Sequence, residues 1–305
     1  MPGYAIVGTG AVGGYYGALL AKAGRKVQFL VHTDFAHVRA HGLRVDSPKG
    51  DFHLPVVDAV SRAEDLEPAD VAVIAWKTTA NGLLPGVLRH AVKPGGTVLV
   101  LQNGLDPERD AAAAAPEARI LSGLCFLCSH KPGPGWIRHL DYGTVSLAAY
   151  GEGPQGVTSG MRAVAGDLGA AGVETRLLED WRAARWRKLV WNIPFNGLCA
   201  LTGKDTAALL HDPETRARIA RLMDEVISGA AACGIVLPAD FRDRMIADTG
   251  KMIPYKPSMQ WDREAGRPME LEAIYRRPLE TIEAAGGQAP AIAELYHGLL
   301  EGLSA

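Results

Sequence analysis

Residues 4–14 read YAIVGTGAVGG, a short apolar run followed at once by the spacing Gly-x-Gly-x-x-Gly. Where such a loop joins a strand to a helix, Gly8 permits a tight turn, Gly10 lets the backbone approach a pyrophosphate, and Gly13 lets the helix pack closely on the strand. Unpaired N–H groups at the start of the helix then face the phosphates. A purely structural glycine turn is the alternative. The stretch favours a dinucleotide-binding loop made by Gly8, Thr9, Gly10, Ala11, Val12 and Gly13.

The alternation of strand and helix continues through the first half of the chain. The expected strands are residues 4–8, 26–31, 71–76, 97–102, 118–126 and 173–178, and the expected helices lie near 12–23, 79–91, 105–115 and 157–171. This alternation predicts a doubly wound α/β sheet of the Rossmann type. Two pairs of shorter runs, 43–46 with 51–56 and 136–140 with 144–150, are each expected to form a hairpin.

From Asp180 onward the pattern becomes helical, with almost no strand signal. The expected helices cover residues 181–200, 213–233, 239–250, 270–285 and 290–303. Asp180 is a suitable N-cap for the first of them, and 305 residues are enough for two cores. We therefore expect an α/β protein with an N-terminal dinucleotide-binding domain, residues 1–179, and an all-helical substrate and catalytic domain, residues 180–305.

The composition is that of an ordinary globular protein, with 48% hydrophobic residues, 22% charged residues and a net charge of −2. This balance argues against nucleic acid as a partner. No apolar run reaches the roughly 18 residues that span a bilayer, and a strand at residue 4 leaves no room for a signal peptide. We therefore expect a cytoplasmic protein with no membrane partner. The CxxC of Cys125 and Cys128 lies in an apolar strand rather than at a helix start, which favours core thiols over a redox pair.

The choice of dinucleotide is expected to depend on FLVHTD, residues 29–34, at the end of the second strand. An acid there accepts a hydrogen bond from the 2′-hydroxyl of NAD, whereas a cation pairs with the 2′-phosphate of NADP. The first position is His32, followed by Thr33, and both side chains can donate to a phosphate. Asp34 is interpreted as the N-cap of the next helix. The stretch therefore favours NADP and leaves NAD as the alternative.

Two further polar residues follow strands of the predicted sheet. Lys77 follows VAVIAW, residues 71–76, and Asn103 follows TVLVLQ, residues 97–102. The carboxyl ends of neighbouring parallel strands meet at the edge where ligands of open α/β sheets bind. Each residue alone fits a polar turn, but the two together indicate a cofactor site.

A third polar group lies in RWRKLVWNIPFN, residues 185–196, which is otherwise largely apolar. On a helix, Lys188, Asn192 and Asn196 fall within about 80° of one another, and apolar side chains cover most of the rest. A buried, unpaired ammonium is costly, and each unsatisfied amide costs roughly 1–3 kcal/mol. Pro194 lies within this stretch and is expected to kink the helix. Either loops and solvent satisfy the three polar side chains, or they face a polar ligand.

The second interpretation leads to a reaction. A small carbonyl compound would lie against this helix with a nicotinamide against the sheet edge, and Lys188 would give the carbonyl oxygen a proton as hydride reaches carbon. Lysine suits this role because burial lowers its pKa toward the working pH. A carboxylate is needed to hold the ammonium, and Glu270 and Glu272 are both candidates at this point.

Together these features resemble 2-dehydropantoate 2-reductase (ketopantoate reductase), almost from end to end. The resemblance rests on the glycine loop, Lys77, the NG at 103–104, the WRKLVWNIPFN helix and the pattern SMxxD…GRxxE, which appears here as Ser258, Met259, Asp262, Gly266, Arg267 and Glu270. It implies NADPH-dependent reduction of a 2-oxo acid to a 2-hydroxy acid, most directly 2-dehydropantoate to pantoate in pantothenate biosynthesis. It implies no metal.

The resemblance also implies roles for the candidate residues. The catalytic residues are Lys188, as proton donor, and Glu270 rather than Glu272, as the acid beside substrate and cofactor. The substrate ligands are Asn192, Asn196 and Ser258, and the cofactor contacts are the glycine loop, His32, Lys77, Asn103 and Glu270.

Departures from the family pattern bear on the pocket. His32 stands where members often have an arginine for the 2′-phosphate, and Thr206 stands where an asparagine commonly contacts the substrate. Pro194 and the ELE at 270–272 also differ from the pantothenate enzymes. A changed pocket wall would keep the chemistry and change the substrate.

Two other functions are compatible with the sequence. One is a nicotinamide-dependent dehydrogenase of another small hydroxy acid or a polyol phosphate; the three arginines in residues 182–187 would then bind the phosphate, although we interpret them as a solvated face. The other is a dinucleotide-sensing protein without turnover, which would not need Lys188. Tyr275 and Tyr296 fit a homodimer interface or a helical core equally well.

Overall fold

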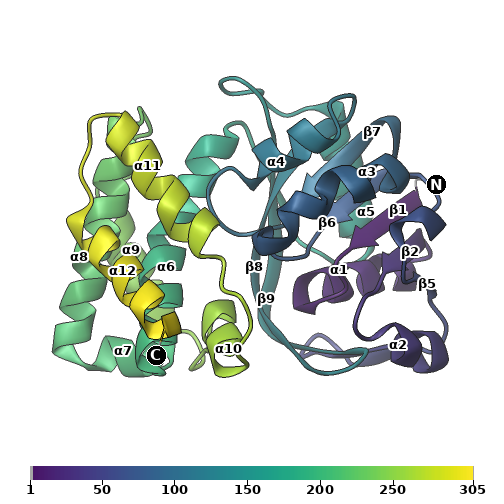
Figure 1. Ribbon diagram of the computed structural model, residues 1–305, viewed down its shortest axis with the longest axis horizontal. Helices are drawn as coiled ribbons and strands as arrows, with labels where there is room; N and C mark the ends of the chain where they lie inside the picture. Colours follow the sequence, from purple (N-terminus) through teal and green to yellow (C-terminus); the bar gives the residue numbers. More distant parts are fainter. Residues whose placement is uncertain (1–2, 305) are drawn as a thin grey trace. The chain divides into compact units, whose positions relative to one another are not determined.

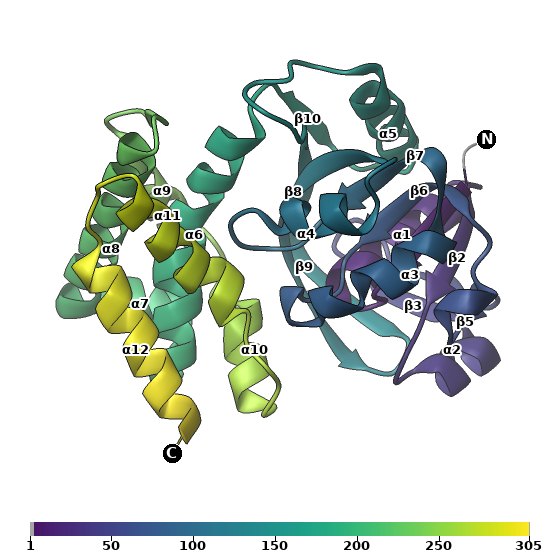
Figure 2. The ribbon, with the colours of Figure 1, turned by 45° about the horizontal axis from the view of Figure 1, so that its top comes forward.

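The chain divides into two compact units in the computed structural model, which describes residues 3–304. The sheet unit holds the residues up to Gln102 and Pro107–Trp181, and the helical unit holds Asn103–Asp106 and the chain from Arg182. In Figures 1 and 2 the sheet carries the purple to teal colours, and the helices of the second unit are mostly green and yellow. The predicted fold class, an α/β protein with a helical C-terminal part, is confirmed.

The sheet has a parallel centre. Strands β1 (Gly3–Val7), β2 (Lys26–Leu30), β6 (Ala69–Ile74), β7 (Val92–Val100) and β8 (Arg119–Gly133) pair in parallel in the order β8-β7-β6-β1-β2. The outer strands are β5 (Asp58–Val60) beside β2, and β9 (Trp136–Ala149), β3 (Leu43–Asp46), β4 (Phe52–Leu54) and β10 (Thr175–Leu178) beyond β8. The strand order reverses between β1 and β6, which marks the ligand-binding edge of a doubly wound sheet.

Helices cover both faces of this sheet. They are α1 (Ala11–Lys22), α2 (Phe35–His41), α3 (Leu84–Ala91), α4 (Pro107–Ala114) and α5 (Ser159–Ala170), with 3₁₀ turns η1 (Ala63–Asp65) and η2 (Thr78–Leu83). Ile6 packs in one core with residues of α1 and α5, whereas its neighbour Val7 packs in another with residues of α3 and α4. Because both faces are buried, the central parts of these strands read as apolar runs, which is why the strands were predicted; β7 begins five residues before its expected start, and β8 ends seven residues after its expected end.

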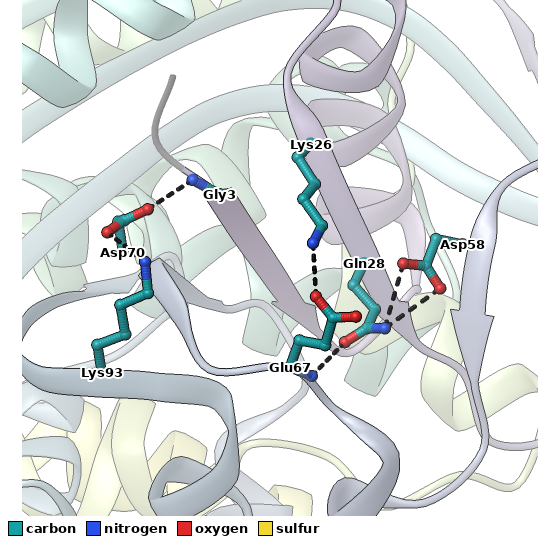
Figure 3. Close-up of polar contacts among 7 residues, drawn as sticks. All are labelled: Gly3, Lys26, Gln28, Asp58, Glu67, Asp70 and Lys93. Carbon is teal, nitrogen blue, oxygen red and sulfur yellow. Dashed lines mark hydrogen bonds and ion pairs between the residues drawn. The ribbon is translucent and has the colours of Figure 1, made fainter.

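Polar side chains tie the central strands together near their amino ends, as Figure 3 shows. Asp70, in β6, accepts a hydrogen bond of 2.8 Å from the N–H of Gly3 in β1. Gln28, in β2, donates to Asp58 in β5 at 3.2 Å and accepts from the N–H of Glu67 at 2.8 Å. These contacts fix the edge of the sheet opposite to the glycine loop and leave the carboxyl ends of the strands for a site.

One predicted hairpin is confirmed and the other is wrong. Residues 43–46 and 51–56 contain the antiparallel pair β3 and β4. Residues 136–150, in contrast, contain the single strand β9, which pairs with β8 along its length. Tyr142, expected in a turn, lies at a bulge with φ of +63°, where the β8–β9 register shifts. A bulge bends a strand without ending it, and the turn-forming residues of DYG do not distinguish these two outcomes.

His139, in β9 close to this bulge, is expected to make stability depend on pH. Its buried ring has Nδ1 2.8 Å from the hydroxyl of Ser47 and Nε2 3.2 Å from the carbonyl oxygen of Tyr142. The carbonyl needs a donor, so a neutral ring that accepts from Ser47 fits both contacts. Burial lowers the pKa of His139, so the unfolded state takes up a proton first as pH falls below about 6.5.

We therefore expect the melting temperature to fall by a few degrees between about pH 7.5 and about pH 5.5. In His139→Gln the fall should be smaller, because the group that must remain neutral is gone. Thermal unfolding of both proteins at the two pH values measures this. An equal fall in the variant would assign the effect to other groups.

The CxxC in β8 is a pair of core thiols, as predicted. Cys125 and Cys128 are both buried, and burial raises the pKa of Cys128 to about 12. A thiol with a raised pKa is a poor nucleophile. All four cysteines of the chain lie among the described residues, and none forms a disulfide.

The helical unit is built from seven α-helices and a π-helix within residues 182–304, the first α-helix starting one residue earlier. They are α6 (Trp181–Thr202), α7 (Thr206–His211), α8 (Pro213–Ala232), α9 (Phe241–Gly250), α10 (Ser258–Glu264), the π-helix η3 (Glu272–Arg276), α11 (Arg277–Ala284) and α12 (Pro290–Ser304). All five predicted helices are present. The short α7 and α10 were missed, because one or two turns are too short to show a 3.6-residue period.

Two expectations about surfaces are also answered here. Tyr275 is fully buried and its ring stacks on that of Tyr296, so this pair belongs to the core of the helical unit. Among residues 3–304, none of the helices combines the length and the apolar character that crossing a bilayer requires.

Candidate active site

The glycine loop joins β1 to α1, as predicted, and each glycine has its own geometric reason. Gly8 has φ of +100°, and a Cβ there would collide with the backbone of Trp76. A Cβ on Gly13 would collide with the carbonyl oxygen of Gly8. A Cβ on Gly10, which precedes the first residue of α1, would meet no atom of the described chain within 4 Å. The loop thus presents bare backbone at a helix N-terminus, which fits a pyrophosphate.

Thr9 fastens this loop to the neighbouring strand. Its hydroxyl donates to the carbonyl oxygen of Leu30, the last residue of β2, at 3.1 Å. The side chain of Thr9 therefore holds the loop in place, and the backbone around it is the part that a phosphate would meet.

Asp34, two residues beyond His32 at the end of β2, is held by the β8–β9 hairpin. It occupies the N-cap position of α2, as predicted, but makes no capping bond to the described helix. Its carboxylate instead accepts from the N–H of Gly135 at 3.0 Å and is ion-paired with Lys131. Burial acts to raise the pKa of Asp34, but these donors hold it below its ordinary value. His32 and Thr33 are exposed, and the hydroxyl of Thr33 also donates to Asp34, at 3.1 Å.

A polar network joins the carboxyl ends of β6 and β7, where the half-buried Lys77 lies. Gln102, after β7, donates to the carbonyl oxygen of Trp76 at 3.1 Å and to Asn81 Oδ1 at 2.6 Å. Asn81 in turn donates to Asp110 of α4 at 2.8 Å. Sequence reasoning missed Gln102 and Asn81; the available signal was a glutamine directly after an apolar strand.

Lys188, Asn192 and Asn196 all lie on α6, as predicted. The two asparagines are 4% and 3% exposed, and Lys188 is half-buried. Among the described residues, no hydrogen-bond partner is found for the buried Nδ2 of Asn192. An unsatisfied buried donor costs about 1–3 kcal/mol, so this amide calls for an acceptor such as a ligand oxygen or an ordered water molecule. The helix continues through Pro194 to Thr202 as one element.

The arginines that precede Lys188 do not form a single solvated face. Arg182 and Arg187 are exposed, as expected, but Arg185 is 1% exposed, so the interpretation is wrong for that residue. At 100° per residue, position 185 falls on the same face of α6 as Lys188 and Asn192. This shared inward face explains why Arg185 is buried.

Ser258 and Glu270 are connected by a turn that other residues of the SMxxD…GRxxE pattern shape. Ser258 opens α10, and the carbonyl oxygen of Glu270 accepts from the N–H of Ile274 at 3.1 Å. Between them, the buried carboxylate of Asp262 accepts a hydrogen bond from Arg267 Nε at 3.1 Å. The main-chain carbonyl oxygen of Asp262 accepts from the N–H of Arg267 at 2.8 Å. Asp262 and Arg267 therefore set the path of the chain from Ser258 to Glu270.

The surroundings of the two candidate acids differ. Glu270 is 3% exposed, whereas the side chain of Glu272 is 43% exposed and is ion-paired with Arg276. A buried carboxylate is the better partner for a substrate or an ammonium in a closed site, so this difference favours Glu270.

Thr206 is occupied by backbone contacts. Its hydroxyl accepts from the N–H of Tyr255 at 3.2 Å, and its own N–H donates to the carbonyl oxygen of Tyr255 at 3.1 Å. The ring of Tyr255 lies 6.5 Å from that of Trp191, and Trp191 donates to Thr249 at 3.1 Å. Thr206 thus anchors the segment that leads to Ser258, beside an aromatic side chain of α6.

The candidate residues are distributed over both units. The glycine loop, His32 and Lys77 belong to the sheet unit, whereas Asn103, Lys188, Asn192, Asn196, Ser258 and Glu270 belong to the helical unit. The sheet unit can hold a dinucleotide, and the helical unit offers an ammonium, amides, a hydroxyl and a carboxylate to a small polar molecule.

Comparisons with known proteins identify the family. The family model described as "Ketopantoate reductase PanE/ApbA" matches residues 4–152 of this chain. The model described as "Ketopantoate reductase PanE/ApbA C terminal" matches residues 180–301. A 2-dehydropantoate 2-reductase of Nostoc sp. is 47% identical over 97% of this chain and 93% of its own. The solved 2-dehydropantoate 2-reductase of Geobacter metallireducens is 39% identical, with a TM-score of 0.93 over 98% of this chain and 99% of its own. That of Methylococcus capsulatus is 35% identical, with a TM-score of 0.87 over 99% of this chain and 96% of its own. The chain belongs to the ketopantoate reductase PanE/ApbA family.

Proposed function

We propose that this protein reduces 2-dehydropantoate to pantoate with NADPH, using Lys188 as the proton donor. The observation that carries the proposal is the polar stripe on α6, where the buried amide of Asn192 needs an acceptor that the described chain does not supply. Membership of the ketopantoate reductase family supports a 2-oxo acid as the source of that acceptor.

The residues divide the work of the reaction between them. NADPH supplies a hydride when bound, and the glycine loop fits its pyrophosphate because Gly10 leaves the backbone bare. Asn192 and Asn196 on α6, together with Ser258 in α10, bind the oxygen atoms of the 2-oxo acid. Lys188 gives a proton to the 2-oxo oxygen as carbon 2 is reduced, so a hydroxyl forms, and the amine regains a proton from solvent. Glu270 holds the ammonium in place beforehand.

The loop after β2 supports NADPH over NADH. An enzyme specific for NAD uses a carboxylate to accept from the ribose 2′-hydroxyl. The acid of this loop, Asp34, is instead engaged by Lys131 and Gly135. His32 is exposed and its ring can donate to a 2′-phosphate, whereas the hydroxyl of the exposed Thr33 donates to Asp34 at 3.1 Å.

Removing Lys131 should therefore change the preference between NADPH and NADH. In Lys131→Met the carboxylate of Asp34 loses its cation and gains freedom to repel a phosphate. We expect the ratio of NADH to NADPH dissociation constants to fall by about tenfold, the size of one charge-assisted hydrogen bond. Fluorescence titration of both cofactors measures the ratio. Lys93→Met, at the other edge of the sheet, is the matched control; an unchanged ratio in Lys131→Met would contradict this role for Asp34.

Substrate choice is tested with a panel of 2-oxo acids. NADPH oxidation is followed with 2-dehydropantoate, with 2-oxoisovalerate, which lacks its hydroxymethyl group, and with phenylpyruvate. We expect 2-dehydropantoate to have the highest kcat/KM, because an analogue without the hydroxyl leaves buried amides unpaired. Preference for phenylpyruvate would instead point to an aromatic 2-oxo acid as the substrate. NADPH binding without turnover of any acid would leave a sensing protein.

A homodimer is the assembly to test first. A solved ketopantoate reductase of Staphylococcus aureus, 19% identical to this chain, is described as dimeric. Tyr275 and Tyr296 do not support such an interface, because they pack on each other in the helical unit. Light scattering on the purified protein decides between monomer and dimer.

A further inference from the structure

The loop that carries Asn103 is held by the helical unit. Asn103–Asp106 follows β7 in the chain, but it groups with the helices. The N–H of Leu105 donates to the carbonyl oxygen of Ala273 at 2.8 Å. Arg277 Nη1 donates to the carbonyl oxygen of Asp106 at 2.9 Å, and Asp106 has φ of +54°. Two hydrogen bonds thus hold a loop whose backbone is otherwise strained.

Gly104 allows this close approach. Its φ is +98°, and a Cβ there would lie 2.5 Å from the Cβ of Ala273 and 2.6 Å from its carbonyl oxygen. Any other residue at this position would push the loop off the helix. The NG of the sequence therefore has a packing reason in addition to its role in a turn.

The π-helix explains why the carbonyl of Ala273 can accept from the loop. The N–H of Arg277 would serve this carbonyl in an α-helix, but in η3 it bonds to the carbonyl of Glu272. The next residue, Pro278, has no N–H. The carbonyl oxygen of Ala273 is therefore left for Leu105.

We propose that Arg277 is a positioning residue that, together with the carbonyl of Ala273, holds Asn103 in place for the nicotinamide half of the cofactor. This inference rests on the proposed function, in which Asn103 contacts the cofactor. The side chain of Arg277 is 15% exposed, and its bond to Asp106 is charge-assisted, which makes it stronger than a neutral one. The contact fixes Asn103 to the unit that also carries Lys188.

The topology assigns the effect to one half of the cofactor. In a doubly wound sheet, the adenosine half lies on the β2 side of the switch point, and the nicotinamide half lies over the strands on the other side. Asn103 follows β7, on the nicotinamide side. Loosening the loop should therefore weaken NADPH binding and leave the binding of 2′,5′-ADP, which has no nicotinamide, unchanged.

The test compares Arg277→Met with its neighbour. Calorimetry measures the dissociation constants of NADPH and 2′,5′-ADP, and amide exchange measures protection of the Leu105 N–H. We expect NADPH to bind about tenfold more weakly in Arg277→Met, 2′,5′-ADP to bind as in the wild type, and Leu105 to exchange faster. Arg276→Met is the control, because Arg276 is half-exposed and ion-paired with Glu272 and Glu280; it should bind both ligands normally.

Two further variants keep the test decisive. Gly104→Ala leaves Arg277 in place but displaces the loop, so it should give the same binding pattern. It replaces Arg277→Met in the test if that variant does not fold. In an Asn103→Ala background, Arg277→Met should cause no additional loss of NADPH affinity, because the two residues act through one contact.

Three results would overturn the inference. They are normal NADPH binding by Arg277→Met, equal weakening of NADPH and 2′,5′-ADP, and a full additional loss in the double variant. A wild-type protein that binds 2′,5′-ADP and NADPH but reduces no 2-oxo acid would overturn the proposed function instead and leave the positioning role supported by its binding pattern.

Discussion

Lys188→Ala is expected to lower kcat/KM for 2-dehydropantoate by about 10²–10⁴-fold, the range for loss of a general acid. The loss should appear mainly in kcat, because the ammonium acts on the carbonyl oxygen as charge develops there. NADPH should bind as in the wild type, since the phosphates are expected on the glycine loop of the sheet unit. Steady-state rates and a fluorescence titration of NADPH measure the two quantities.

Two lysine variants control this result. Lys204 is on the surface of the same unit, 3.3 Å from Asp212, and Lys204→Ala should leave the rate unchanged. Lys188→Arg keeps a positive charge but holds its proton too firmly to donate it, so it should bind substrate and turn over slowly. If Lys188→Ala kept more than about a tenth of the wild-type kcat, the role of proton donor would have to go to another group.

Gly10→Ala is expected to weaken NADPH binding by about 10- to 100-fold with no loss of stability. The backbone of Gly10, with φ of −85°, is open to alanine, and the new Cβ would meet no atom of the described protein within 4 Å. It would instead project toward the space that the pyrophosphate needs, and over-packing by a methyl group costs about 1–3 kcal/mol. Titration of NADPH and thermal unfolding measure the two effects.

Other glycines provide the controls for this variant. Gly86, in α3, also has open space around its would-be Cβ, and Gly86→Ala should keep NADPH affinity and gain slight stability. Gly13→Ala should lose stability as well as affinity, because its Cβ would collide with the backbone of Gly8. Unchanged NADPH affinity in Gly10→Ala would show that the phosphates lie elsewhere.

The features that could be predicted from the sequence are those set by local pattern. A strand segment buried on both faces is apolar, so strands near residues 71–76 and 97–102 could be predicted from the sequence. The glycine spacing has a backbone reason at each position, and it predicted the loop that the structure contains. The stripe of Lys188, Asn192 and Asn196 follows from helical geometry alone.

The features that could not be predicted depend on contacts between distant segments. Asp34 has the local signature of an N-cap, but Lys131 and Gly135 reach it from a hairpin about a hundred residues later. Tyr142 lies in a turn-like DYG, and only pairing with β8 on both sides makes it a bulge. The π-helix η3 could not be predicted from the spacing of apolar residues. It leaves the carbonyl oxygen of Ala273 without a helical donor, and the N–H of Leu105, from a distant loop, donates to that oxygen.

The alternatives that the sequence left open are narrowed in the same way. The residues by themselves left Glu270 and Glu272 both open; the family resemblance implied Glu270, and the exposure of Glu272 and its ion pair with Arg276 favour the same choice. The arginines before Lys188 also needed the structure, because Arg185 turns inward while Arg182 and Arg187 do not.

Transfer of deuterium from the cofactor to the product tests the central claim most directly. The protein is incubated with 2-dehydropantoate and NADPH that carries deuterium at both positions of nicotinamide carbon 4, and the mass of the pantoate formed is measured. The account predicts pantoate heavier by one deuterium, located on carbon 2. Pantoate without deuterium, or no pantoate while NADPH binds, would contradict it.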